Sequence, residues 1–413
     1  MHFFRLICLC LLCPMFALAQ YGSINGKITR SDNKGAIAHA SVFLSNSSFG
    51  TSSNDDGNYT LNNVRPGQYT LVVTAIGYDD YIKTVLVANQ PINLDISLST
   101  KTIQLRDVII TTPANWKTNY EKFKKEFIGS DENAKLCEVI NPQILSFIYS
   151  KKKQTLEAYA DDFLIVENRA LGYRVKYLVK NYKSDGISGL ISYSGQQLFE
   201  ELPGKAAQKK KWQVKRDEAY YGSSMHFFRS LYKDRLTEEG FEAYGLIRLP
   251  NENRPPDAVI FRNIQRFKEI NSYIAQDSLR YWMGKDNTSR YNFNTLSSIK
   301  YMSSEICKTT EQPGIFALTF PACLYVVYTK KREETYFRDL FRPLTMPNYE
   351  VTTLSYFDDK QYTLFDMNGI VVGHGPLYEG TWTKSRLSML LPVDYLPVDQ
   401  LNNNNQALLP SLK

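Results

Sequence analysis

The feature that most constrains the fold is an alternation of apolar and polar residues within the first hundred positions. In PINLDISLS (91–99), Ile92, Leu94, Ile96 and Leu98 share one face, and the residues between them are polar. This period of two predicts a half-buried strand. Further strands are predicted at SVFLS (41–45), QYTLVVTAI (68–76) and DYIKTVLV (80–87). Six or seven short strands within roughly 80 residues favour a β-sandwich.

Turn residues separate these strands. Asp56-Gly57 and Gly77 are typical of tight turns. At Pro66-Gly67 the proline fixes φ and the glycine accepts a positive φ, so a type II turn is predicted.

Five ordered motifs give this region a specific resemblance. They are Gly26-Lys27-Ile28, Ala40-Ser41-Val42, the turn from Asn54 to Tyr59, Pro66 to Leu71, and Ile76 to Tyr78. Residues 21–112 with these motifs resemble the carboxypeptidase regulatory-like domain, a transthyretin-like sandwich of seven strands. LRDVIITT (105–112) is similar to the segment that follows this domain in TonB-dependent outer-membrane receptors.

The resemblance implies a scaffold without catalytic residues, related in fold to carbohydrate-binding sandwiches. Fold kinship alone does not establish sugar binding. If the sandwich did bind glycans, Tyr78 and Tyr81 are the rings to inspect, and we expect both to pack instead. Asn54–Asp56 could hold a cation, but a tight turn is the simpler interpretation. The zinc carboxypeptidase signature H-x-x-E is missing at His226 and His374.

The N-terminus has the pattern of a secretory signal peptide over residues 1–19. Arg5 precedes an apolar run from Leu6 to Leu18, and Ala17-Leu18-Ala19 fits an A-x-A cleavage site. A lipoprotein signal at Cys13 is weaker, because Leu12 stands where a small residue is needed. We therefore expect an exported protein of the periplasm or outer membrane, with no transmembrane span in the mature chain.

The larger region mixes helical and strand patterns. Along PANWKTNYEKFKKEFIG (113–129), aromatic residues recur every three or four positions, which predicts a helix. YRVKYLVKNY (173–182) alternates, and a turn at 183–186 predicts a hairpin. SSMHFFRSLYKDRL (223–236) predicts a capped helix with Phe227, Phe228, Leu231 and Leu236 on its buried side. Late strands are predicted at 350–357, 360–365, 369–374 and 386–392.

The fold class is therefore mainly β with α+β, a sandwich followed by a larger α+β domain. ENRALGYRVKY (167–177) and YYGSSMHFFRSL (220–231) resemble an uncharacterised domain that follows the regulatory-like module in bacterial envelope proteins. The predicted boundaries are a signal peptide at 1–19, the sandwich at 20–100, a linker at 101–113, the α+β domain at 114–400 and a loose polar tail at 401–413.

Positive charge is concentrated in the larger region. Residues 20–112 carry seven basic and seven acidic residues, whereas 113–413 carry 41 Lys and Arg against 35 Asp and Glu. The basic runs lie at 150–154, 205–216 and 329–334, and we interpret them as solvated hairpins and loops. Contact with acidic glycans or lipid headgroups is the alternative. A nucleic-acid partner is not expected for an exported protein.

One short segment gathers residues able to bind or react. It contains Tyr220, Tyr221, Ser223, His226 and Arg229. A serine beside a histidine can form a nucleophile–base pair, and a helix N-terminus with His and Arg can receive an anion. Serine is also a preferred N-cap, and no G-x-S-x-G elbow surrounds Ser223 or Ser224. A capped core helix is the favoured interpretation, so no catalytic residue is assigned.

Cysteine and histidine are scarce outside the signal peptide. The remaining cysteines are Cys137, Cys307 and Cys323. Cys307 and Cys323 could close one disulfide, and three separate buried thiols are equally compatible with the sequence. No metal site and no cofactor are predicted, since the segment after residue 19 contains no C-x₂-C pair and only three histidines.

Taken together, these features predict a non-enzymatic envelope protein that acts by binding or assembly. Its expected partner is an envelope protein or a glycan. A cryptic hydrolase that acts on glycan or peptide through the larger domain is the alternative. The sequence does not fix the oligomeric state.

Overall fold

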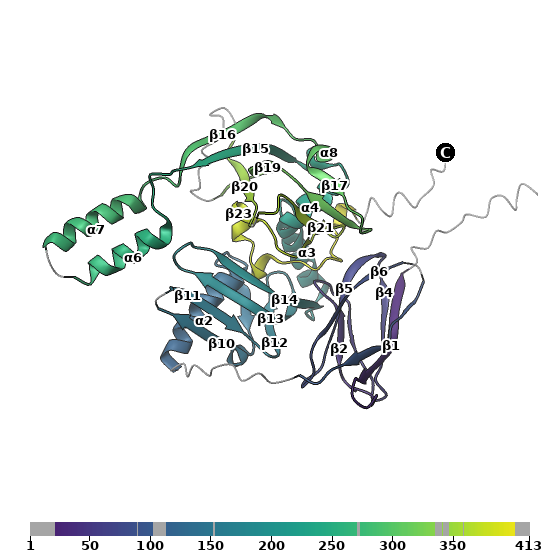
Figure 1. The fold of residues 1–413 in the computed structure, drawn as a ribbon. Helices are drawn as coiled ribbons and strands as arrows, with labels where there is room; N and C mark the ends of the chain where they lie inside the picture. The colour runs from purple at the N-terminus through teal and green to yellow at the C-terminus, as the bar shows by residue number, and fades with distance from the viewer. Residues whose placement is uncertain are drawn as a thin grey trace, which may run out of the picture.

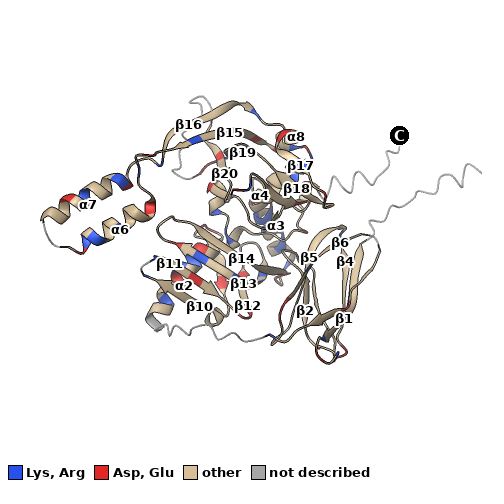
Figure 2. Ribbon diagram, viewed as in Figure 1, with Lys and Arg blue, Asp and Glu red and all other residues tan. Residues whose placement is uncertain are grey.

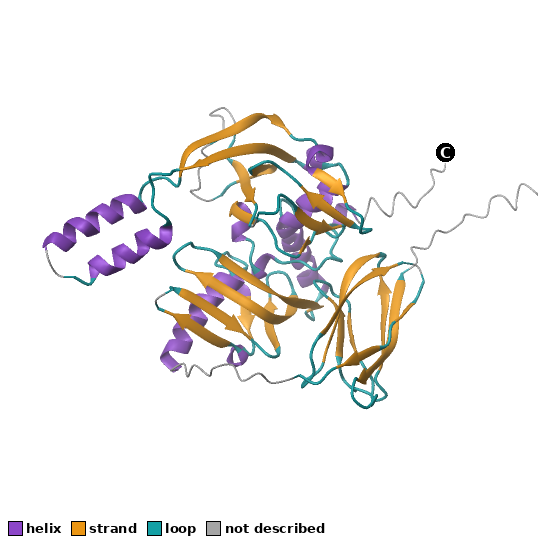
Figure 3. Ribbon diagram, viewed as in Figure 1, coloured by secondary structure: helices purple, strands orange, loops and turns teal. Residues whose placement is uncertain are grey.

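The computed structural model describes residues 21–88, 90–101, 113–151, 153–270, 273–334, 341, 347–357 and 359–400. Figure 1 shows a sandwich from the first hundred residues, a central sheet, and an upper region of sheets that carries a projecting helical hairpin. Strands predominate (Figure 3), so the predicted class, a β-sandwich followed by an α+β region, is confirmed. The predicted signal peptide, residues 102–112 of the linker, and the tail at 401–413 lie outside the described residues.

The sandwich consists of two four-stranded sheets. One has the order β4-β1-β7, with β8 also paired to β1, and the other has the order β3-β2-β5-β6. The strands are β1 (Gly22–Arg30), β2 (Ser41–Leu44), β3 (Gly50–Ser52), β4 (Asn58–Val64), β5 (Gly67–Thr74), β6 (Tyr81–Val87), β7 (Ile92–Asn93) and β8 (Ile96–Leu98). Alternate aliphatic side chains from both sheets fill the core, among them Ile24, Ile28, Val42, Leu61, Leu71, Val73 and Ile96.

Two local predictions in the sandwich need correction. The strand predicted at 91–99 is divided into β7 and β8, because the Asp95 carboxylate accepts a hydrogen bond from the Lys27 amide at 2.8 Å and interrupts the pairing. The type II turn at Pro66-Gly67 is wrong. Gly67 has no positive φ and instead begins β5, paired with Val87. The turn at Gly57 is confirmed by its φ of 80°.

The central sheet has the order β10-β11-β13-β12-β9, and β14 pairs along the other edge of β13. Its strands are β9 (Cys137–Val139), β10 (Ser146–Ser150), β11 (Thr155–Tyr159), β12 (Phe163–Asn168), β13 (Tyr173–Asp185) and β14 (Ile191–Glu201), with short 3₁₀ turns η1 (Ala134–Leu136) and η2 (Pro142–Ile144). Helix α2 (Pro113–Ile128) packs on one face, with the Phe123 ring 4.8 Å from that of Tyr182 and the Phe127 ring 5.0 Å from that of Tyr177. The predicted helix is confirmed.

The predicted hairpin is also confirmed, but its turn is displaced. β13 continues to Asp185, and the turn occupies 186–190 with Gly189 at a φ of 74°. The Asp185 carboxylate accepts hydrogen bonds from the amides of Ile187 and Ser188, which fixes the turn after the strand rather than within it.

The upper region contains a five-stranded sheet, β16-β15-β19-β20-β23, and a four-stranded sheet, β17-β18-β21-β22. The strands are β15 (Phe241–Pro250), β16 (Tyr291–Lys300), β17 (Cys307–Thr309), β18 (Ile315–Leu318), β19 (Cys323–Arg332), β20 (Tyr349–Ser355), β21 (Thr363–Asp366), β22 (Val371–Val372) and β23 (Leu377–Gly380). The helices are α3 (Ala206–Tyr220), α4 (Ser224–Tyr232), α5 (Leu236–Glu239), α6 (Asp257–Lys268), α7 (Tyr273–Asp286), α8 (Ser303–Ile306), η3 (Thr381–Lys384) and η4 (Leu387–Met389).

Two predictions in this region are wrong. The basic run at 205–216 belongs to helix α3 rather than to a hairpin or loop, because Trp212 and Arg216 lie on one helical face that is buried. The strand predicted at 386–392 instead contains the 3₁₀ turn η4, where Leu387 and Ser388 are buried. The late strands at 350–357 and 360–365 are present as β20 and β21.

The sandwich packs directly on the central sheet. Leu178 and Leu198 of that sheet form an apolar cluster with Phe43 and Val72 of the sandwich. The backbones also meet, because the Asn46 amide donates to the Gln197 carbonyl at 2.7 Å. Full burial of each leucine contributes about 1.5–3 kcal/mol, so this interface fixes the sandwich in place.

A segment near the C-terminus, residues 390–400 and called here the strap, closes the interface from a second side. Val393 lies in the sandwich core, and its amide donates to the Asn46 carbonyl at 2.6 Å. The Asp394 carboxylate accepts hydrogen bonds from the amide and hydroxyl of Ser48, and Arg65 donates to the Asp394 carbonyl at 3.0 Å. The sandwich is therefore held by two distant parts of the larger domain.

Candidate functional site

The predicted site forms around the first turn of α4. Gly222 precedes the helix with a φ of 85°, and a side chain there would lie 2.7 Å from the Tyr328 ring. Ser223 is the N-cap, and its hydroxyl accepts a hydrogen bond from the backbone amide of His226 at 3.2 Å. The predicted cap and buried side chains are confirmed, but the predicted helix is divided: α4 ends at Tyr232, Asp234 has a φ of 54°, and Leu236 begins α5.

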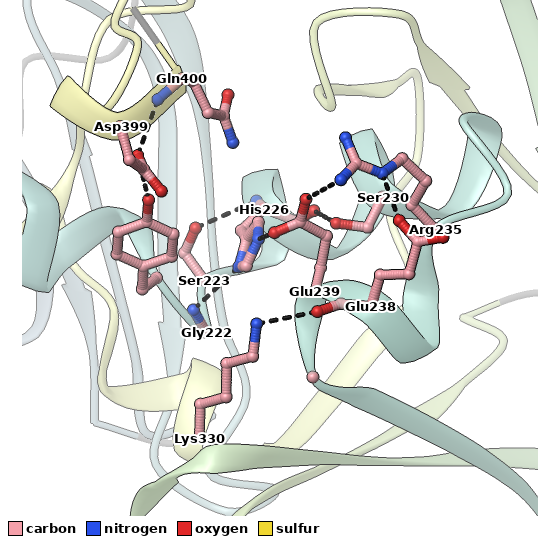
Figure 4. Close-up of polar contacts among 12 residues, drawn as sticks. Gly222, Ser223, His226, Ser230, Arg235, Glu238, Glu239, Lys330, Asp399 and Gln400 are labelled. Carbon is pink, nitrogen blue, oxygen red and sulfur yellow. Dashed lines mark hydrogen bonds and ion pairs between the residues drawn. The ribbon is translucent and has the colours of Figure 1, made fainter. Parts of the chain in front are cut away.

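The His226 ring is sealed in the core, with 1% of the residue exposed. Its Nδ1 accepts from the Gly222 amide at 3.2 Å, which assigns the proton to Nε2, and Nε2 lies 3.2 Å from the Glu239 carboxylate (Figure 4). Burial lowers the pKa of His226 to about 4, although Glu239 acts in the opposite direction. The imidazole is therefore neutral near pH 7, and both of its nitrogens are engaged.

This geometry bears on the nucleophile–base hypothesis. A working pair needs the imidazole nitrogen within hydrogen-bond reach of the serine hydroxyl. The Ser223 hydroxyl instead meets the peptide amide of His226, and the ring contacts Gly222 and Glu239 (Figure 4). Ser223 therefore acts as a helix cap, and the His226 ring forms a buried polar contact between Gly222 and Glu239.

Arg229 lies one turn further along α4 and is also buried. Its Nε donates to the Asn368 carbonyl at 2.9 Å, its Nη1 to the Tyr395 carbonyl at 3.0 Å, and its Nη2 to the Val393 carbonyl at 2.7 Å. Two of these acceptors belong to the strap. The guanidinium thus joins α4 to the strap, and the strap to the sandwich, rather than presenting charge to an external anion.

The two tyrosines complete the same junction. Tyr220 is buried, and the Arg229 guanidinium lies 5.5 Å from the centre of its ring. The Tyr221 hydroxyl donates to the Asp399 carboxylate at 2.5 Å (Figure 4). All five predicted residues therefore lie within α4 or directly before it. We call this set, Tyr220, Tyr221, Ser223, His226 and Arg229, the α4 junction.

The sequence did not reveal the partners of the α4 junction. Asn368 uses its side-chain amide to donate to the Gln68 carbonyl in the sandwich at 2.7 Å, which adds a third link across the interface. Asp366 lies beside it, and burial raises the pKa of this carboxyl to about 6 against hydrogen bonds from Ile370 and Asn368. The Asn368-Gly369 turn was the available signal, but a turn motif does not name its tertiary contacts.

The disulfide alternative for Cys307 and Cys323 is not realised. Both residues are free thiols, as is Cys137. Cys307 begins β17 in the four-stranded sheet and Cys323 begins β19 in the five-stranded sheet, which separates them into different strand networks. Burial raises the pKa of Cys307 to about 11 and that of Cys137 to about 12.

The sandwich features considered for binding are the turn at Asn54 and the rings of Tyr78 and Tyr81. Within the described ranges, no group of three or more His, Cys, Asp or Glu is placed to hold a metal ion. The Asn54 carbonyl accepts from the Gly57 amide at 2.9 Å, as in a tight turn. Tyr78 and Tyr81 are half-buried and pack against the sandwich core.

A groove beside α3 has a volume of about 390 Å³. Its lining combines apolar and basic side chains: Leu136, Trp212, Lys135, Arg169, Lys211 and Lys215. Several of the cations have acidic neighbours, such as Glu138 for Arg169 and Glu218 for Lys215. The lining also includes one carboxylate, Glu132, which pairs with Lys135, beside the four cations.

Comparison with known families assigns the first of these domains. Residues 24–110 match the family model of the CarboxypepD_reg-like domain. The N-terminal sandwich is a CarboxypepD_reg-like domain. This match covers about a fifth of the chain, so it leaves the activity of the larger domain open. The search of curated proteins finds no match.

Solved structures show only distant likeness. The pilus 2b backbone protein of group B streptococcus is 18% identical over 20% of this chain and 42% of its own, with a TM-score of 0.18. The minor pilin GBS52 of Streptococcus agalactiae is 13% identical over 21% of this chain and 48% of its own, with the same TM-score of 0.18. A DUF3823 family protein from Bacteroides ovatus is 13% identical over 45% of this chain and 82% of its own, with a TM-score of 0.16. The chain thus spans less than half of either pilus protein, and such scores support no functional argument.

Proposed function

We propose that this protein is a non-enzymatic, exported protein of the cell envelope that acts by binding or assembly in the periplasm or at the outer membrane. The observation that carries the proposal is the α4 junction. Its imidazole contacts Gly222 and Glu239, and its serine hydroxyl caps α4. Its guanidinium bonds the carbonyls of Val393 and Tyr395 in the strap, which contacts the CarboxypepD_reg-like domain. These side chains therefore hold α4 in place, and through Arg229 and the strap they support the sandwich on the larger domain.

A rigid body offers preformed surfaces, which lowers the conformational cost of binding a partner. The edge strand β6 presents Ile82 and Leu86 outward, 49% and 56% exposed. An edge strand with exposed aliphatic side chains is a ready surface for a second polypeptide. We propose an envelope protein as the partner at this edge.

Capture from envelope extract with the full-length mature chain tests this proposal. Ile82→Ser combined with Leu86→Ser should abolish retention of a specific partner, whereas Ile140→Ser combined with Leu190→Ser, at similarly exposed sites of the larger domain, should retain it. Peptide sequencing of protein from the periplasmic fraction should find an N-terminus at Gln20. Turnover of a glycan or peptide by the pure protein would instead establish the hydrolase alternative.

A glycan is the second candidate partner, and the groove beside α3 favours it. A hollow of about 390 Å³ with a basic rim matches an acidic oligosaccharide in size and charge. Affinity electrophoresis should show retardation by an acidic polysaccharide but not by a neutral one, and Lys211→Glu should remove it. Equal retardation by both polysaccharides would count against the groove.

A further inference from the structure

The helical hairpin α6–α7 is inserted between β15 and β16 and projects from their ends, on the far side of the molecule from the sandwich (Figure 1). Among the described residues of these helices, Ile260 is buried in α6 and Ala275 is buried in α7. A unit of two helices is too small to bury most of its apolar side chains within itself. Its surface therefore needs a partner or an environment that tolerates apolar groups.

Exposed apolar side chains are concentrated on this arm, defined here as residues 247–302. Ten of the 23 large hydrophobic residues that are exposed in the described chain lie in it. The most exposed within the hairpin are Tyr273 at 81% and Ile274 at 79%, with Ile270 beside them at 45%. These three residues lie where the two helices meet, at the free end of the arm, and we call them the tip.

Basic residues stand immediately behind the tip. Between 262 and 280 the described sequence contains four basic side chains, Arg262, Arg266, Lys268 and Arg280. Two acidic residues accompany them, Glu269 and Asp277, and Asp277 pairs with Arg280 at 3.2 Å. The end of the hairpin thus carries a net positive charge, and Figure 2 shows blue segments along α6.

We infer that the tip inserts into the interfacial region of an anionic lipid surface. Apolar side chains at the end of the arm match the boundary of the acyl chains, and basic side chains one to two turns behind match the headgroup layer. Tyrosine favours this boundary because its ring is apolar and its hydroxyl stays hydrated. A lipid surface explains why the most exposed groups lie at the end of the hairpin rather than along one side of it.

The attachment is peripheral. Among the described residues, no helix combines the length and the apolar character needed to cross a bilayer. The inference deepens the proposed envelope function by naming a lipid surface as one partner. It is tested with purified protein and vesicles, so its failure would leave the capture experiment at the β6 edge unaffected.

Co-sedimentation with vesicles tests the inference directly. The full-length mature protein should bind vesicles of phosphatidylglycerol and phosphatidylethanolamine and bind pure phosphatidylcholine much more weakly. Tyr273→Ser combined with Ile274→Ser should weaken binding to the anionic vesicles by at least about tenfold, because two large apolar groups no longer leave water. The control Ile76→Ser, at a sandwich residue that is 95% exposed, should bind as the unchanged protein does.

Charge and self-association give two further readouts. Arg266→Glu combined with Lys268→Glu should reduce binding to the anionic vesicles and leave the weak neutral binding unchanged. Unaltered binding by the tip variant would overturn the inference. So would light scattering that shows a dimer for the unchanged protein and a monomer for the tip variant, since a second copy would then cover the tip. Circular dichroism should show the same fold for every variant, because all the substituted side chains are exposed.

Discussion

Replacement of Arg229 by methionine should destabilise the protein severely without changing the volume of the site much. Arg229 is 7% exposed, and its three donors reach the carbonyls of Asn368, Val393 and Tyr395. Methionine keeps the apolar stem against Tyr220 but leaves all three carbonyls without this partner. Each unpaired buried carbonyl costs about 1–3 kcal/mol.

The substitution also removes a charged group whose burial away from water is itself costly, and this gain offsets part of the loss. The net loss in free energy of unfolding should be about 3–5 kcal/mol, the range for removing one partner of a buried charged network. Urea denaturation followed by tryptophan fluorescence measures it as a lower midpoint, with the slope compared to detect a second transition.

A matched control separates this effect from loss of a positive charge. Arg280→Met removes an exposed arginine, with 82% of its side chain accessible, and should change the free energy of unfolding by less than about 0.5 kcal/mol. Arg229→Lys should fall between the two, because one ammonium cannot span three carbonyls. A loss below about 1 kcal/mol for Arg229→Met would refute the junction as described.

The remaining predictions concern the His226 ring, one glycine and the thiols. His226 has a folded pKa of about 4 and an unfolded value near 6.5, so the unfolded chain binds a proton that the folded chain rejects, and stability falls as pH drops from about 6.5 toward 4. Between pH 6.5 and 4 the free energy of unfolding should therefore fall by up to about 3 kcal/mol less in His226→Gln than in the unchanged protein, and identical profiles would contradict the assignment. Gly172→Ala should lower Tm by several degrees, because φ is 72° and a β-carbon would lie 2.1 Å from the Trp212 ring, whereas Gly284→Ala in α7 meets no atom within 4 Å and should be neutral or stabilising. Thiol titration in denaturant without reductant should detect one thiol at each of Cys137, Cys307 and Cys323. The thiols of the folded protein should react slowly. Detection of fewer than three thiols would support a disulfide instead.

Local sequence patterns predicted those parts of the fold that depend on neighbours along the chain. The strands of the sandwich and helix α2 follow from residues spaced by two and by three or four positions. Helix α3 was missed because its lysines dominate the composition. Its buried residues, Trp212, Arg216, Ala219 and Tyr220, nevertheless follow a helical spacing that could have revealed it.

Such local patterns could not predict contacts between segments that are distant in the sequence. Ser48 and Asp394 meet across 346 positions, and Asn368 and Gln68 across 300. Leu178 on the otherwise charged face of β13 was the one local sign that another layer covers that sheet. Without an opposing surface, an isolated leucine there carries no directional information.

The candidate site shows the same division. Ser223, His226 and Arg229 were grouped because they lie within two turns of one helix, and the structure keeps them together. Their role depended on Glu239 and on carbonyls 139 to 166 positions away. A cluster of reactive residue types is thus compatible with catalysis or with a buried junction until its partners are known.

The central claim is that the CarboxypepD_reg-like domain and the larger domain form one body through the α4 junction and the strap. Native-state hydrogen exchange of backbone amides in β2 and β5, compared between the unchanged protein and Arg229→Met, tests it most directly. Although the substituted residue lies outside the sandwich, we predict that these sandwich amides exchange at least about tenfold faster in the variant, together with those of α4. Unchanged protection in β2 and β5 alongside faster exchange in α4 would contradict the claim.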